Sequence, residues 1–236
     1  TDSNGAVATA TATITEPASI AVTTNNPSIG CNGGTAVLTA TAGGGTGNLV
    51  YSLDGVAYQA SSSFTVNAGT YSITVKDANG CVATSAPVTL VNPSALSAII
   101  TSQTNASGFG LSNGSVVVTA NGGTPGYSVS PSQTGLSAGT YTFTVTDANG
   151  CSTTVTATIT QPAALVASVS SQTNVSINGG SNGSAVVSAT GGVGPYTLSS
   201  SSGTVSGNTV IGLSAGTYVF TVTDANGNTA TASATI

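Results

Sequence analysis

One short sequence unit recurs along the chain, and this repetition constrains the fold more than any other feature. The run Ala-Gly-Thr-Tyr occurs three times, at 68–71, 138–141 and 215–218. Each copy precedes an alternating stretch that closes with the turn Asp-Ala-Asn-Gly, found at 77–80, 147–150 and 224–227. A related turn, Asp-Ser-Asn-Gly, occupies residues 2–5. Self-similarity of this kind is typical of repeat architectures, so each copy predicts one structural unit.

A second mark defines the limits of the units. Pro17, Pro93 and Pro162 each stand just before a new apolar segment. The opening run TDSNGAVATATATI also matches the closing run TDANGNTATASATI, so the chain opens with the end of a unit. We therefore predict a terminal strand of a preceding repeat and three complete repeats, over residues 1–16, 17–93, 94–162 and 163–236.

The alternation within each unit predicts strands. In 140–146, Tyr141, Phe143 and Val145 fall on one face and threonines on the other, which is the period of two of a half-buried strand. In the second unit we expect strands over 96–104, 115–120, 127–130 and 140–146, and a last strand around 155–159. About seven short strands in about 70 residues, with Gly-rich turns between them, indicate a small β-sandwich. The predicted fold is all-β: a tandem array of three immunoglobulin-like sandwiches, preceded by the last strand of another repeat.

Two sets of recurring residues are expected to be structural. An aspartate that opens a turn accepts backbone hydrogen bonds, and a glycine three residues later supplies the positive φ of a type I turn followed by a bulge. These residues are Asp77 and Gly80, Asp147 and Gly150, and Asp224 and Gly227. The second set consists of tyrosines at the start of the strand before each turn, where a tyrosine anchors the core of such sandwiches. These are Tyr71, Tyr141 and Tyr218.

Composition excludes several classes of function. Charged residues make up 3% of the chain, the net charge is −5 and Lys76 is the single base, so nucleic acid and anionic membranes are poor partners. No apolar run approaches the roughly 20 residues of a membrane span. The chain has no histidine and few carboxylates, which argues against an enzyme, and we expect no catalytic, cofactor-binding or metal-binding residues. The alternation also directs Lys76 away from the core, so an isopeptide bond is not expected.

Three motifs resemble the SprB-type repeat of Bacteroidota cell-surface proteins. They are Cys31-Asn32-Gly33, the run from Gly191 to Tyr196, and the run from Gly135 to Cys151. The middle motif is degraded at 43–48, and the tryptophan that usually follows the tyrosine is absent. The family is named after a large flavobacterial gliding adhesin that is exported by the type IX secretion system. The resemblance therefore implies an extracellular, cell-surface chain.

The expected function is a passive one. This segment would space and transmit force within a large secreted adhesin filament used in gliding motility and surface adhesion. Its partners would be neighbouring repeats of the same chain, with surface polysaccharide or substratum as further candidates. The alternative is a glycan-binding module of an extracellular adhesin or biofilm protein, for which Tyr58 and Phe109 are the best exposed aromatic candidates.

Three cysteines, Cys31, Cys81 and Cys151, leave the disulfide pairing open. An exported chain is expected to oxidise its thiols, but three is an odd number. Cys31 with Cys81 would close a bridge inside the first repeat. In an immunoglobulin-like sandwich, however, the loop that holds Cys31 and the turn that holds Cys81 lie at opposite ends, beyond the roughly 7 Å Cα separation that a disulfide allows.

The same topology offers another pairing. Cys31 would face the turn of the next repeat, which holds Cys151, and form an interdomain staple. At the following joint Leu111 would face Asn228, and neither residue carries sulfur. Cys81 would then pair with a residue upstream. Both Cys31–Cys151 and Cys31–Cys81 remain possible on the sequence alone.

Overall fold

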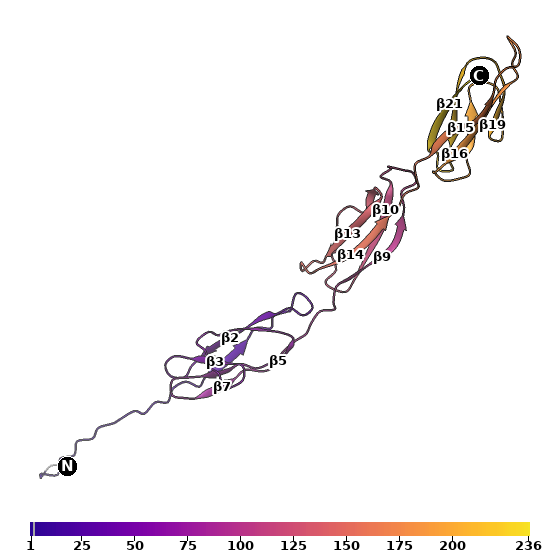
Figure 1. Cartoon of the computed structure of the whole chain (residues 1–236). Coiled ribbons are helices and arrows are strands. Elements are labelled where there is room, and N and C mark those ends of the chain that lie inside the picture. The colour runs from indigo at the N-terminus through magenta and orange to yellow at the C-terminus, as the bar shows by residue number, and fades with distance from the viewer. Residues whose placement is uncertain (2) are drawn as a thin grey trace. The chain divides into compact units, whose positions relative to one another are not determined.

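The computed structural model describes residues 1 and 3–236, and none of these residues lies in a helix. The turn predicted at 2–5 includes Asp2, which lies outside the described residues. Contacts divide the chain into two compact units. Unit 1 contains Thr1–Ala95, Gly122–Thr124 and Asn149–Cys151, and unit 2 contains Leu96–Asn121, Pro125–Ala148 and Ser152–Ile236. The predicted fold class is confirmed, because every regular element is a short strand and the strands form small sheets (Figure 1).

The second sandwich shows the topology most simply. Its strands are β9 (Ser97–Thr104), β10 (Gly114–Asn121), β11 (Ser128–Ser130), β12 (Thr134–Leu136), β13 (Gly139–Thr146) and β14 (Ser152–Ile159). One sheet has the order β12-β10-β9 and the other β11-β13-β14. In the lettering of immunoglobulin-like domains these sheets are A-B-E and C-F-G, which is the arrangement that defines the fold. The strands predicted for this repeat are confirmed to within a few residues.

The period of two sets the core of the second sandwich. Phe143 and Val145 of β13 are fully buried, and Ile159 of β14 is 1% exposed. The intervening threonines of β13 and β14 pair across the ladder on the outer face, as Thr140 and Thr158 do with hydroxyls 3.1 Å apart. Because successive side chains of a strand point to opposite faces, every second residue of each strand can contribute to this core.

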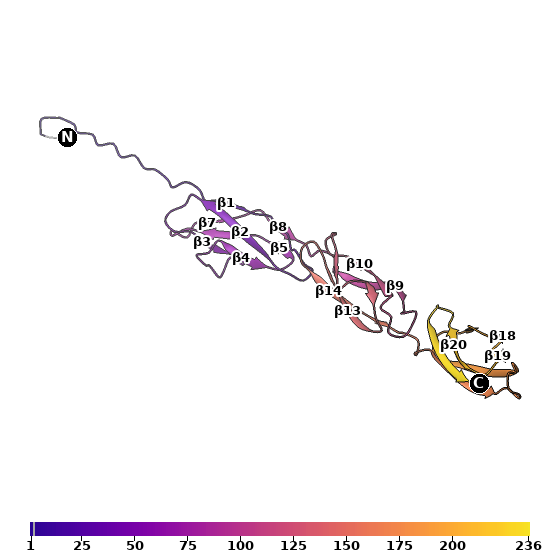
Figure 2. The same ribbon diagram turned by 90° about the horizontal axis from the view of Figure 1, so that it is seen from above.

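The third sandwich repeats this plan with one added strand. Its strands are β15 (Val166–Thr173), β16 (Gly183–Thr190), β17 (Thr197–Ser200), β18 (Thr204–Ser206), β19 (Thr209–Leu213), β20 (Thr217–Thr223) and β21 (Thr229–Thr235). The added strand is β18, which pairs with β19; Figure 2 labels both strands. The sheets have the orders β15-β16-β19-β18 and β17-β20-β21, which correspond to A-B-E-D and C-F-G. Phe220 and Val210 are fully buried between them.

The first sandwich is less regular. Its strands are β1 (Ala21–Thr24), β2 (Ala36–Gly43), β3 (Val50–Ser52), β4 (Ser63–Val66), β5 (Gly69–Tyr71), β6 (Thr74–Lys76), β7 (Val82–Thr84) and β8 (Val88–Leu90). Proline cannot donate to a ladder, and Pro87 falls where the last strand divides into β7 and β8. At this break the buried Ser85 hydroxyl accepts the backbone N–H of Ile73 at 3.0 Å. The side chain therefore replaces a bond that the ladder lacks.

Residues 1 and 3–16 are exposed and lie outside the strands of the structure. The assignment of 1–16 to the last strand of a preceding repeat therefore stays a prediction. The limits 17–93, 94–162 and 163–236 also stay a prediction. Three separate hydrophobic cores lie within them, around Leu38, Phe143 and Phe220.

Candidate functional site at two loop–turn joints

The β6–β7 turn (residues 77–81) is organised by one carboxylate. Asp77 is 5% exposed, and its Oδ1 accepts the backbone N–H groups of Asn79 at 3.0 Å and Cys81 at 2.8 Å. Its Oδ2 accepts the N–H of Thr46 at 2.9 Å, which fastens the turn to the β2–β3 loop. Gly80 adopts a φ of 85° and donates its N–H to the Asp77 carbonyl at 3.1 Å. The aspartate therefore holds two separate chain segments together.

The same arrangement recurs in the β20–β21 turn (residues 224–228). Oδ1 of Asp224 accepts the N–H groups of Asn226 and Asn228, both at 2.9 Å, and Oδ2 accepts the N–H of Val193 at 3.0 Å. Gly227 has a φ of 82°. In the intervening β13–β14 turn, Asp147 is likewise 5% exposed and Gly150 has a φ of 83°.

These hydrogen bonds favour the ionised carboxylates. The pKa of Asp77 lies below its usual value, chiefly because the Thr46 N–H donates to it. The pKa of Asp224 is also lowered, chiefly by the side-chain amide of Asn228. The third such group is Asp54, where the N–H of Val56, the Ser52 hydroxyl and the N–H of Ala57 lower the pKa to about 2.

The three recurring tyrosines lie against the cores. Tyr71, Tyr141 and Tyr218 are half-buried and pack against the first, second and third cores respectively. The Tyr141 hydroxyl donates to the carbonyl of Ser137 at 3.0 Å, and the Tyr218 hydroxyl donates to that of Ser214 at 3.1 Å. A tyrosine bonded to the backbone four residues upstream is the tyrosine corner of such sandwiches.

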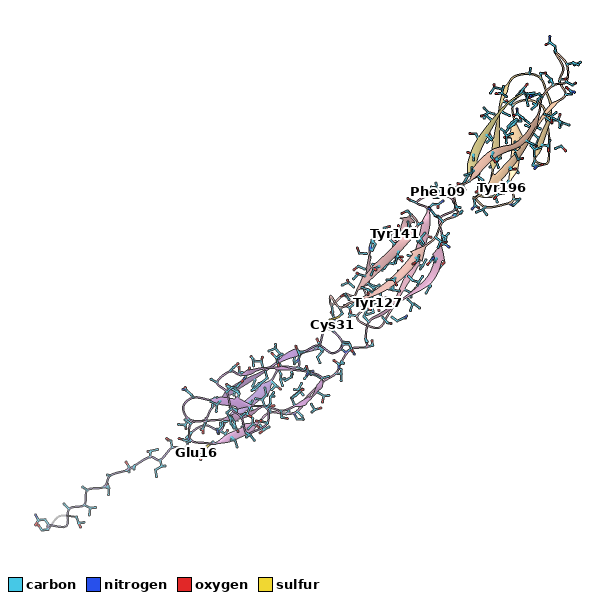
Figure 3. All side chains as sticks on the ribbon, viewed as in Figure 1. Glu16, Cys31, Phe109, Tyr127, Tyr141 and Tyr196 are labelled. Atoms are coloured by element: carbon cyan, nitrogen blue, oxygen red, sulfur yellow. A yellow bond between two sulfur atoms is a disulfide. The ribbon has the colours of Figure 1, made fainter. Side chains whose placement is uncertain are left out.

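The structure contains a disulfide between Cys31, in the β1–β2 loop, and Cys151, in the β13–β14 turn. Their Cα atoms are 5.7 Å apart, and Figure 3 labels Cys31. Both residues belong to unit 1. Cys81 instead carries an exposed thiol, so the bridge is Cys31–Cys151 and not Cys31–Cys81. Beside the bridge, the Asn149 side-chain amide donates to the Gly30 carbonyl at 3.1 Å.

A second loop–turn pair lies within unit 2, where the β9–β10 loop (residues 105–113) meets the β20–β21 turn. The side-chain amides of Asn226 and Asn228 both donate to the Ser107 carbonyl, at 2.8 Å and 3.2 Å. Gly108 is buried, and a Cβ added to it would lie 2.8 Å from Cγ of Asn228. Gly108 therefore occupies the place at this joint that Cys31 occupies at the other.

The prediction that Leu111 faces Asn228 is wrong. Gly33 and Gly110 both adopt a φ of 74° and mark the same position of the two loops. In the first loop the carbonyl of Cys31, two residues before Gly33, accepts the N–H of Gly34. In the second loop the carbonyl of Gly108, two residues before Gly110, accepts the N–H of Leu111. Leu111 thus corresponds to Gly34. The positive-φ glycine sets the loop register, so the spacing between motifs alone gives the wrong partner for Asn228.

The aromatic candidates for glycan binding differ in accessibility. Tyr58 is half-buried, and the Lys76 ammonium lies 3.9 Å from its ring centroid, so one ring face is covered. Phe109 is 62% exposed and borders a hollow of about 380 Å³ whose other walls include Leu165 and Asn228. Tyr196, which the sequence marks only as the end of the Gly191–Tyr196 motif, is 42% exposed and lines a hollow of about 420 Å³ with Asn208; Figure 3 labels its side chain.

Neither a metal-ligand cluster nor a membrane-spanning helix is found among the described residues. No three His, Cys, Asp or Glu side chains gather there in an arrangement that could hold a metal ion. No helix in this part of the chain is long and apolar enough to cross a membrane.

Comparison with known structures finds several multidomain proteins. The N-terminal eight immunoglobulin domains of Down syndrome cell adhesion molecule are 12% identical, with 92% of this chain and 40% of that chain covered and a TM-score of 0.27. A C-terminal fragment of intimin, in complex with the intimin-binding domain of its translocated receptor, is 18% identical and has a TM-score of 0.30. That match covers 70% of this chain and 56% of the intimin chain. The chain thus spans less than two thirds of either protein. Fibronectin(III)-like modules of Clostridium thermocellum CbhA are 15% identical, with 60% of this chain and 95% of that chain covered and a TM-score of 0.28.

Comparison with protein families gives a more specific result. No curated protein matches the chain. Residues 169–205 match the family described as SprB repeat. The matched stretch runs from β15 into β18 and includes the Gly191–Tyr196 motif. This match supports a SprB-type repeat at residues 169–205.

Proposed function

We propose that this chain is a structural repeat segment of a large extracellular adhesin, and that it spaces and transmits force at a cell surface during gliding and adhesion. The SprB repeat at 169–205 supports the adhesin assignment. The observation that carries the mechanical role is the Cys31–Cys151 disulfide, because a covalent cross-link decides which residues bear tension. Disulfides persist in oxidising, extracellular compartments, which supports a location outside the cell.

The mechanical argument follows from the covalent path alone. Tension that enters the chain before Cys31 passes through the two sulfur atoms and leaves along β14. The bridged residues are separated by 120 positions, so β2 to β13 lie outside the loaded path. Even if these strands unfolded, their length could not be added to the extended chain. The array would therefore keep its length under load better than an uncrosslinked array.

Single-molecule pulling of the whole chain, held at its two ends, tests this proposal. At up to about 3.6 Å per residue, 120 residues correspond to about 430 Å of contour length. We expect the fully unfolded chain to be shorter by about this length without reductant than after reduction of the disulfide. A Cys31→Ser, Cys151→Ser variant should give the longer value in both conditions. Equal lengths for the oxidised and reduced wild type would refute the mechanical role.

The adhesin assignment needs its own test. Antibody raised against the purified chain should label intact cells of the producing organism, and protease added outside the cells should remove the label. Labelling only after the cells are permeabilised would refute an extracellular role.

One observation favours glycan binding as a second candidate function. The Tyr196 hydroxyl donates to the Gly191 carbonyl at 2.6 Å, which fixes the ring at the edge of its hollow. A rigid, partly exposed aromatic ring next to an amide such as that of Asn208 suits the apolar face and hydroxyl groups of a sugar. Binding of the chain to a glycan array, lost on Tyr196→Ala, would support this candidate.

A further inference from the structure

The β6–β7 turn of the first sandwich has an asparagine at its third position, as do the two turns that hold a loop, and a cysteine at its fifth position, as does the β13–β14 turn. At those two joints the third turn residue, Asn149 or Asn226, donates its side-chain amide to a loop carbonyl, that of Gly30 or Ser107. The loop residue that follows this carbonyl lies against the fifth turn residue. At one joint these two residues are the bonded Cys31 and Cys151.

The corresponding residues of the β6–β7 turn are Asn79 and Cys81. Asp77 gives this turn the same hydrogen bonds that Asp224 gives to the β20–β21 turn. Asn79 and Cys81 are exposed, and neither the Asn79 amide nor the Cys81 thiol bonds to any described residue. The turn therefore has the geometry and the side chains of an occupied site.

The groove beside this turn also resembles the hollow beside the β20–β21 turn, which the β9–β10 loop borders. Residues 16–20 and Gly45 line a groove of about 210 Å³ next to Asn79 and Cys81. In the third sandwich, residues 163–165 and Gly192 line the hollow that Phe109 of the bound loop borders. The two walls correspond in their backbone, because Gly45 donates its N–H to the Ala18 carbonyl at 2.8 Å and Gly192 donates to that of Ala163 at 2.9 Å.

We propose that this groove and turn bind the loop between the first two strands of another SprB-type repeat, and that Cys81 forms a disulfide with a cysteine of that loop. The occupant is a Cys-Asn-Gly loop like that of residues 31–33, with its cysteine at the position of Cys31. The inference rests on the proposed role as a repeat segment. In the reaction two thiols lose two protons and two electrons to a small disulfide oxidant such as oxidised glutathione, which becomes two thiols.

The chain supplies a probe for this site. Ile177, in the β15–β16 loop, corresponds to Cys31, because Gly179 has a φ of 74° and Gly180 donates its N–H to the Ile177 carbonyl at 3.0 Å. Ile177 is 70% exposed. A full-length donor with Ile177→Cys and Cys81→Ser therefore presents a thiol on a loop of the required type. The acceptor is the wild-type chain, and both keep the Cys31–Cys151 bridge.

Donor and acceptor, carrying different tags, are mixed in a glutathione redox buffer, and the mixed dimer is followed on non-reducing gels and by peptide mapping. We expect a disulfide between positions 177 and 81. It should form at least about tenfold faster than the disulfide with a control donor that carries Val219→Cys and Cys81→Ser, because docking raises the effective thiol concentration. Val219 is 54% exposed but lies on a strand.

Two acceptor variants test the geometry. Asn79→Ala should slow the reaction with the position-177 donor and leave the control donor unaffected, because it removes the amide that holds the loop. An acceptor with Cys81→Ser and Val82→Cys, whose thiol is exposed but one residue displaced, should react at the control rate. Equal rates for both donors, or no effect of Asn79→Ala, would overturn the proposal. The pulling and labelling measurements do not involve Cys81, so their outcomes are independent of this one.

Discussion

Gly108 lies against the side chain of Asn228, in the position that Cys31 takes against Cys151 at the other joint. The two joints therefore share one geometry, and sulfur is present at only one of them. The side-chain hydrogen bonds that accompany each contact are also alike, since the Asn149 amide donates to the Gly30 carbonyl and the Asn226 amide donates to that of Ser107. The disulfide adds a covalent bond to a docking mode that does not require it.

This relationship predicts that a second staple can be installed. A chain with Gly108→Cys and Asn228→Cys should form the new disulfide on purification in air, because the added Cβ would lie at bonding range of the position-228 side chain. Thiol titration of the unfolded chain should then count one free thiol, from Cys81, and the cross-link should add roughly 2–4 kcal/mol to the free energy of unfolding. The variant with Gly108→Ser and Asn228→Ser is the control. Three free thiols would show that the joint does not have this geometry.

The tyrosine corner contributes a hydrogen bond that can be measured. Tyr141→Phe keeps the ring against the core but removes the hydroxyl that donates to Ser137, so we expect a loss of about 1 kcal/mol in the free energy of unfolding. Tyr141→Ala should cost about 3–5 kcal/mol, as large-to-small core substitutions of aromatic residues do. Urea unfolding monitored by circular dichroism measures both. An equal cost for Phe and Ala at this position would contradict the assignment.

Acid should weaken the fold through the turn carboxylates. The pKa of Asp54 is lowered from 3.8 to about 2 in the folded chain, and those of Asp77 and Asp224 are lowered in the same direction. A group whose folded pKa is depressed stabilises the fold above its unfolded pKa, and this stability is lost as the pH falls through the folded pKa. We expect a melting temperature that is nearly constant from about pH 7 to 5 and falls between about pH 4 and 2.

Asp54→Asn isolates one part of this pH dependence. The amide cannot ionise, so the variant should melt at a lower temperature than the wild type at neutral pH and should lose less on acidification. Differential scanning calorimetry at several pH values makes the comparison. A wild-type melting temperature that rises below pH 4, or profiles that run parallel at every pH, would be inconsistent with the Asp54 hydrogen bonds.

The passive role predicts little response to ligands. We expect no change of melting temperature with calcium or with a chelator, and weak or no signal on a glycan array. Tyr196→Ala is the informative variant on the array, because its ring lines the hollow of about 420 Å³ in the third sandwich. One strong glycan signal that disappears in this variant would establish the lectin alternative. A clear upward shift with calcium would instead reveal a metal site.

The sequence alone determined the local structure, because the physics of a strand or a turn acts over a few residues. Alternation at Tyr141, Phe143 and Val145 fixed which face of β13 is buried, and Asp224 with Gly227 fixed the turn that follows β20. The positions of these turns also gave the fold class, since an immunoglobulin-like sandwich is the arrangement that short paired strands at this spacing favour.

Only the tertiary structure decided how distant segments meet. The second carboxylate oxygen of Asp77 accepts the N–H of Thr46, which lies 31 positions away in the sequence. No local sequence pattern predicts such a bond. The placement of Gly108, rather than Leu111, against Asn228 depends on the left-handed backbone of Gly110. The structure likewise decided between Cys31–Cys151 and Cys31–Cys81, because it places the β13–β14 turn against the loop that holds Cys31. These contacts join residues that are distant in the sequence. Which residues meet therefore depends on the conformation of the loops and not on the spacing of the motifs.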